Sequence, residues 1–104
     1  MTFNFSVEDK FDELPPRIQA YLPTFFKNRW EDFLWFESAL KDQNFKEIRD
    51  YCHKQIGVAT CYNSYKLHEV VRHIQIHARA ENFAEVKSAY ISLRDYLIEC
   101  KKRI

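Results

Sequence analysis

Apolar residues recur every three or four positions through most of this chain, with polar residues between them. From about residue 23 to residue 101 this spacing places the apolar side chains on one face of a helix, and the alternation typical of strands is absent. The three prolines all fall in the first quarter of the chain, and the only glycine is Gly57. Because residues that interrupt helices are so rare, the pattern predicts an all-α protein.

The pattern resolves into four long helices. Two of them, over about 45–61 and 83–101, begin with Asn, then Phe, with Glu at the third helical position, which is a capping pattern. A helix from Asn63 or Ser64 to about Ala80 lies between them. The first long helix runs from Pro23 to about Lys41, with an apolar stripe made of Phe25, Phe26, Trp30, Phe33, Leu34, Phe36 and Leu40.

A short extra helix is expected before these four. Ser6 offers a cap-like start, and Pro15 and Pro16 suit the beginning of a helix. We therefore predict one domain over residues 1–104: an antiparallel up-down four-helix bundle whose short N-terminal helix covers one end. The aromatic residues Phe3, Phe5 and Phe11 are expected to dock on the bundle or on a partner.

Charge and composition exclude several classes of function. The net charge is +1, which is too small to attract nucleic acid or an anionic membrane electrostatically. The sequence has neither a run of about 20 apolar residues nor a basic region followed by an apolar one, so we expect a cytoplasmic protein. We also expect a monomer, and a dimer through the aromatic N-terminus is left open as the alternative. Cys52, Cys61 and Cys100 have no CxxC motif and no regular spacing, so we interpret them as buried or idle thiols rather than as redox or metal-binding residues.

The candidate chemistry centres on His53 and Gly57. They lie four residues apart, one above the other on a helix, although glycine in a helix interior costs about 0.5–1 kcal/mol relative to alanine. At about 100° per residue, His53 lies at the border of the core-facing stripe, with Lys46 in the same column. An exposed neutral imidazole is a nucleophile, and Gly57 leaves bare surface beside it.

A second cluster offers an alternative. Glu69, His73 and His77 are spaced four residues apart on the next helix, and two histidines at this spacing can bind zinc. Such a site needs a further ligand from a neighbouring helix. We favour a solvated or partly packed face here and predict no metal and no cofactor.

Over about residues 22–99 the chain resembles histidine-containing phosphotransfer (HPt) domains. The resemblance rests on Asn44-Phe45-Lys46-Glu47-Ile48-Arg49, on His53 and Gly57 in the family pattern His-x-x-Lys-Gly, on Asn63 and Leu67 ten and fourteen positions after the histidine, and on the turn at 79–82. The family fold is a four-helix bundle with an extra N-terminal helix.

The resemblance implies a phosphocarrier rather than a stand-alone enzyme. His53 would accept a phosphoryl group from the aspartyl phosphate of a receiver domain, in a response regulator or hybrid histidine kinase, and pass it on. Mg²⁺ would come with the receiver. Gly57, Lys46, Arg49 and Lys54 are the residues expected to meet this partner.

One position departs from the family pattern. Ile56 stands where the family has a lysine that helps to hold the phosphoryl charge, and its helical phase places it in the core stripe. Lys54 points about 100° away from His53, whereas Lys46 and Arg49 lie on its side. The departure leaves an alternative: a pseudo-HPt adaptor that binds a receiver or kinase without carrying phosphate.

Overall fold

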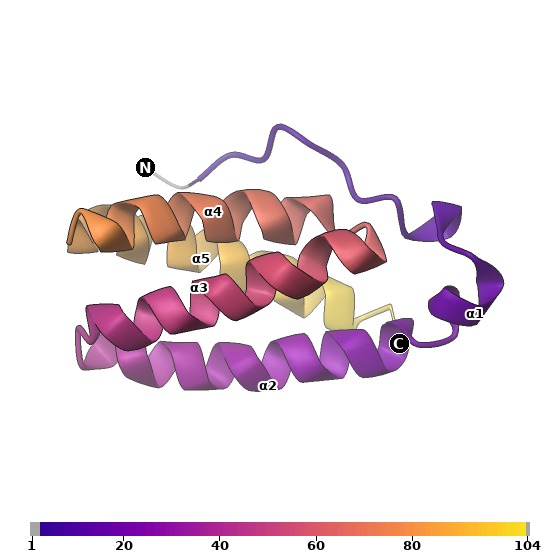
Figure 1. Ribbon diagram of the computed structural model, residues 1–104, viewed down its shortest axis with the longest axis horizontal. Coiled ribbons are helices and arrows are strands. Elements are labelled where there is room, and N and C mark those ends of the chain that lie inside the picture. Colours follow the sequence, from indigo (N-terminus) through magenta and orange to yellow (C-terminus); the bar gives the residue numbers. More distant parts are fainter. Residues whose placement is uncertain (1–2, 104) are drawn as a thin grey trace.

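Four long helices form an antiparallel bundle in a computed structural model that describes residues 3–103. Helices adjacent in sequence pack on each other, and the first long helix also packs on the last, which closes the ring. Figure 1 shows this arrangement, and no strand occurs within residues 3–103. The all-α prediction is therefore confirmed. The long helices are α2 (Leu22–Lys41), α3 (Phe45–Ala59), α4 (Tyr65–Arg79) and α5 (Phe83–Lys101).

The predicted caps are present at the starts of α3 and α5. The side-chain oxygen of Asn44 accepts the Glu47 backbone N–H at 3.2 Å, and that of Asn82 accepts the Glu85 N–H at 3.3 Å. Each bond satisfies one amide that a helix start leaves without a partner. The α3 helix ends at Ala59, two residues earlier than predicted, and continues as the short 3₁₀ helix η2 (Thr60–Tyr62).

The three turns between the long helices share a backbone feature. Each contains one residue with a positive φ: Gln43 at 50°, Asn63 at 55° and Glu81 at 54°. This left-handed conformation ends a helix sharply and is usually taken by glycine. It sets the tight reversals that keep successive helices antiparallel.

The core follows the predicted stripes with one clear exception in α2. Phe33 and Phe36 are fully buried, but Leu34 is 49% exposed, so its predicted place in the core was wrong. The buried side chains of α2 follow the line Phe26, Arg29, Phe33, Phe36 and Leu40, with Phe25 and Ala39 beside its two ends, and Leu34 lies off this line. The position that completes the stripe is taken by Arg29, which is only 6% exposed.

The N-terminal segment, residues 3–10, is not helical, so the helix predicted to begin near Ser6 is wrong. The amide and hydroxyl of Ser6 donate to the Glu69 carboxylate of α4 instead of capping a helix of their own. The first helical turn is the 3₁₀ helix η1 (Phe11–Glu13), followed by α1 (Pro16–Gln19) at the end of the bundle. As expected, Pro16 occupies the first position of α1.

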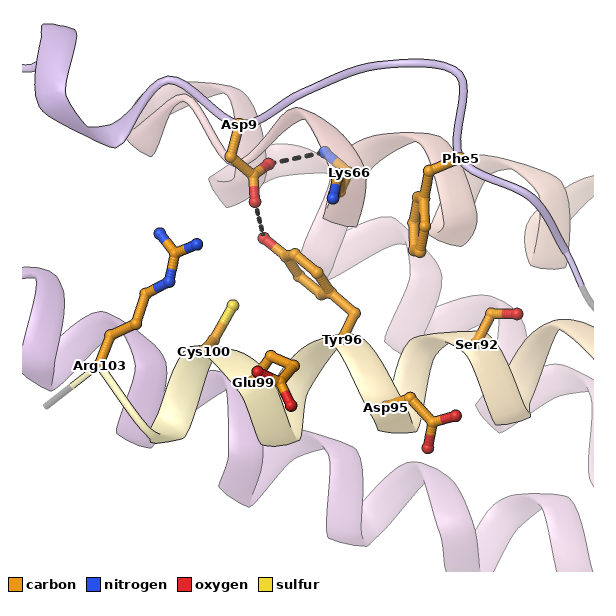
Figure 2. Close-up of a pocket in the computed structure, with 9 residues that line it drawn as sticks. All are labelled: Phe5, Asp9, Lys66, Ser92, Asp95, Tyr96, Glu99, Cys100 and Arg103. Atoms are coloured by element: carbon orange, nitrogen blue, oxygen red, sulfur yellow. Dashed lines mark hydrogen bonds between the residues drawn. The ribbon is translucent and has the colours of Figure 1, made fainter.

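This segment runs along α4 in the opposite direction and docks on the bundle (Figure 1). The Asp9 carboxylate accepts the Lys66 amide of α4 at 2.9 Å and the Tyr96 hydroxyl of α5 at 2.6 Å, as Figure 2 shows. Burial raises the pKa of Tyr96. Phe5 packs against Tyr96, with ring centroids 5.8 Å apart, so its aromatic ring serves the fold.

Within residues 3–103, no helix combines the length and the apolar character needed to cross a lipid bilayer.

Candidate functional site

His53 projects from the outer side of α3. Its neighbour Cys52 is fully buried, as are Ile48 and Ala59 on the same stripe, while His53 itself is exposed. The helical phase predicted this position at the border of the core, and the structure confirms the exposure. The imidazole is therefore reachable by another protein.

Gly57 lies one turn further along α3 and is also exposed. Outside its chain neighbours and the backbone of its own helix, no atom of residues 3–103 would lie within 4 Å of a Cβ at this position. The φ of Gly57 is not positive, so its backbone does not require glycine either. The missing side chain therefore serves no packing or conformational purpose within the described part of the chain.

The three cations predicted to accompany His53 have different surroundings. The Lys54 ammonium is 3.0 Å from Asp32 of α2, which directs it away from the His53 column. The Lys46 ammonium is exposed and lies 3.0 Å from Asp50. Arg49 is half-buried one turn before His53. The structure thus pairs Lys46 within α3 and Lys54 with α2, and the place of Arg49 and Lys46 on the side of His53 stays a prediction from helical phase.

Ile56 is half-buried and packs against the core, close to its predicted position. It lies one turn from His53 on the same helix. An apolar side chain held there supplies no charge to a group bound at the imidazole.

The inner side of α3 carries a polar network that the sequence analysis missed. The Arg29 guanidinium donates to the side-chain carbonyl of Gln55 at 2.7 Å, and the Gln55 amide donates to Asp32 at 2.9 Å. Arg29 also lies 3.4 Å from Asp32. A signal was available, since Arg29 and Gln55 both fall at apolar-stripe positions of their helices. Polar residues at such positions indicate a buried hydrogen-bonded pair.

A cleft of about 290 Å³ opens between α2 and α3 beside this network. Trp35, which is 46% exposed, lines it together with Asp32, Asp50 and Lys54. Tyr51 lies at its base, and burial raises the pKa of the Tyr51 hydroxyl. The cleft belongs to the side of α3 that faces α2.

The second predicted cluster is rearranged. Glu69 is held by Ser6 of the N-terminal segment rather than joining the two histidines. His73 and His77 are close together, with ring centroids 4.5 Å apart. The acidic residue that reaches them is Glu85 of α5, with a carboxylate oxygen 3.3 Å from His73 Nε2. Sequence spacing along one helix could not reveal this neighbour from the next helix.

The three cysteines carry free thiols in different surroundings. Burial raises the pKa of the Cys52 thiol to about 12 and that of the Cys100 thiol to about 11. Cys61 is exposed in η2, which follows α3. The two buried thiols therefore have little thiolate character at neutral pH.

In comparisons with known proteins, no family model matches the chain, and no curated protein or solved structure is significantly similar to it.

Proposed function

We propose that this protein is a phosphocarrier of the HPt type in a two-component phosphorelay. His53 takes a phosphoryl group from a receiver-domain aspartyl phosphate and later gives it to another receiver. The partner receiver, in a response regulator or a hybrid histidine kinase, brings the Mg²⁺. The protein itself acts as a cytoplasmic monomer and a carrier rather than as a complete enzyme.

One observation supports this proposal above the others: an exposed histidine lies beside a glycine that the chain does not need for its own packing. Glycine at this exposed helical site lowers the stability of the fold by about 0.5–1 kcal/mol relative to alanine. A partner that approaches the helix closely accounts for that loss, because a flat surface at Gly57 lets the reacting atoms meet at His53.

The transfer itself requires little from this chain. A ring nitrogen of His53 attacks phosphorus, the N–P bond forms as the P–O bond of the acyl phosphate breaks, and the aspartate carboxylate of the receiver leaves. Catalysis of such a step consists mainly of positioning and of stabilising the charge on the phosphoryl oxygens. By helical phase, Arg49 and Lys46 are the cations of α3 that lie on the side of His53.

The test is phosphotransfer from a panel of labelled receiver domains to the wild-type protein and to His53→Gln. We expect acid-labile label on the wild type and none on the variant. His68→Gln, at a half-buried histidine of α4, is the matched control and should be labelled like the wild type. Label that survives His53→Gln would show that another residue is the acceptor.

Gly57→Arg tests the docking surface separately. The open space around Gly57 allows the bundle to fold with a larger side chain, while the arginine should prevent close approach of the receiver. We expect transfer to fall by at least about tenfold with unchanged circular dichroism, which would correspond to about 1.4 kcal/mol of lost transition-state stabilisation. Normal transfer by this variant would show that the partner docks elsewhere.

The alternative is a pseudo-HPt adaptor, and the apolar environment of Ile56 favours it. Such a protein binds a receiver or kinase without accepting phosphate. A receiver that binds the wild type and His53→Gln equally, with no label at any time, would select this alternative. Ile56→Lys then becomes informative, because transfer gained by this change would identify the missing cation as the cause.

A further inference from the structure

A cluster of two imidazoles and one carboxylate lies at the α4–α5 hairpin. His73 and His77 come from successive turns of α4, and Glu85 comes from the first turn of α5. One potential ligand atom from each residue lies within 4.8 Å of the other two. All three side chains are partly buried, and neither His53 nor Gly57 belongs to the cluster.

The spacing of these atoms suits a transition metal. Two ligand atoms that each lie about 2.0–2.1 Å from a tetrahedral zinc ion are separated by roughly 3.3–3.4 Å. His73 Nε2 and Glu85 Oε2 are already 3.3 Å apart. A nitrogen of His77 lies within 4.8 Å of both atoms, so this ring has to move closer to complete the site.

The local fold fixes the backbone around the cluster. The Asn82 amide donates to the His77 carbonyl at 2.8 Å, which holds the turn closed. The Asn82 side chain in turn accepts the Glu85 amide at 3.3 Å, so the first turn of α5 is anchored beside the end of α4. The Phe3 ring covers one side of His73, with centroids 4.9 Å apart. The three side chains therefore project from one short helical hairpin whose backbone holds them close together.

We propose that His73, His77 and Glu85 form a binding site for a divalent transition-metal ion, with Zn²⁺ as the ion that fits best. Two imidazole nitrogens and one carboxylate oxygen are the ligands of many three-residue zinc sites, and the fourth position is taken by water. The ion bridges α4 and α5 across the turn at residues 80–82. The site is independent of phosphotransfer at His53.

A His73–Glu85 ion pair by itself is the competing explanation. It accounts for the 3.3 Å distance but assigns no part to His77. The two explanations differ in what His77 does, and this residue is therefore the decisive position for mutation.

The experiment measures Zn²⁺ binding to untagged protein by competition with a chromophoric chelator, and Co²⁺ binding by visible absorption. We expect one equivalent of either ion and the intense d–d bands of a four- or five-coordinate cobalt site. His77→Ala and Glu85→Gln should each weaken binding by at least tenfold and remove the bands. Circular dichroism checks that these variants stay folded.

Two controls separate this site from other zinc ligands of the chain. His68→Gln removes a histidine of α4 outside the cluster, and Cys61→Ser removes the exposed thiol. Both variants should bind Zn²⁺ like the wild type. Absence of stoichiometric binding in the wild type would overturn the proposal, and so would binding that persists in His77→Ala or disappears in Cys61→Ser.

Discussion

Helices α3 and α5 begin in the same way and end up in different surroundings. Both start with a capping Asn followed by Phe, and the two Phe rings, Phe45 and Phe83, meet edge to face at 6.4 Å. Beyond this start, the N-terminal segment bonds to α5 at Ser92 and Tyr96, whereas α3 presents His53 and Gly57 to solvent. A shared start fixes where a helix begins, and the residues that follow decide which side stays open.

Their inner sides differ as well. The buried residues of α5 are mainly apolar, among them Val86, Leu93 and Leu97, while α3 buries Gln55 in a bond to Arg29. The contact of α3 with α2 thus includes a buried polar bond, whereas α5 bonds to its neighbours through the half-buried tyrosines Tyr90 and Tyr96. Five measurements test this contrast, in order of decreasing expected effect.

Thiol reactivity should show the largest difference. At about pH 8 a disulfide reagent should modify Cys61 at least tenfold faster than Cys52 or Cys100, because burial both shields those thiols and raises their pKa. One thiol should react rapidly, and Cys61→Ser should abolish this rapid phase. Rapid modification of Cys100 in the native protein would show that the packing around the C-terminal end of α5 opens readily.

Arg29→Met should strongly destabilise the α2–α3 contact. It leaves the fully buried Gln55 carbonyl without its donor and removes one cation from Asp32. We expect a loss of about 3 kcal/mol in the free energy of unfolding by urea, at the lower end for a broken buried pair because Lys54 still pairs with Asp32. Lys54→Met removes the exposed partner of Asp32 and should change the free energy of unfolding by less than about 1 kcal/mol. Equal effects of the two changes would contradict the central role of the buried network.

Tyr96→Phe should loosen the N-terminal segment from α5. The change removes the hydroxyl that donates to Asp9 and leaves that carboxylate without this partner. Hydrogen bonds to charged groups contribute about 1.5–3 kcal/mol, so we expect a loss of about 2 kcal/mol and faster amide exchange near residue 10. Tyr21→Phe, at an exposed tyrosine, is the control and should have little effect.

Asn44→Ala and Asn82→Ala test the shared start of the two helices. Each removes one capping bond, and each should lower stability by about 1 kcal/mol. Asn28→Ala, at an exposed position inside α2, should cause no loss. Very unequal losses of stability in the two variants would show that the two caps, although alike in sequence, do not stabilise their helices equally.

Gly57→Ala should stabilise the fold. No atom of a neighbouring helix within residues 3–103 opposes a Cβ there, so the helix gains the alanine preference of about 0.5–1 kcal/mol. Urea unfolding measures the gain. A loss of stability would mean that the glycine serves the fold, and the argument for a partner at this surface would weaken.

The parts of this molecule that depend on local sequence could be predicted, and those that depend on contacts between helices could not. Period and capping residues located all four long helices to within about two residues. The same local signals suggested a helix at Ser6, where the distant Glu69 decides the outcome. They also placed His53 at the border of the core-facing stripe of α3. They assigned Glu69 rather than Glu85 to the two histidines, because the contact between His73 and Glu85 depends on how α4 and α5 meet.

The three turns between the long helices contain no glycine, although their backbone conformation favours it. Gln43, Asn63 and Glu81 hold the left-handed conformation at the three helix reversals, and glycine is absent from all of them. For a residue with a side chain this conformation costs roughly 1–2 kcal/mol, least for asparagine. Glycine in these turns would relieve that cost, and alanine at position 57 would favour the helix. The proposed contact with a receiver gives a reason why the glycine stands on the helix instead.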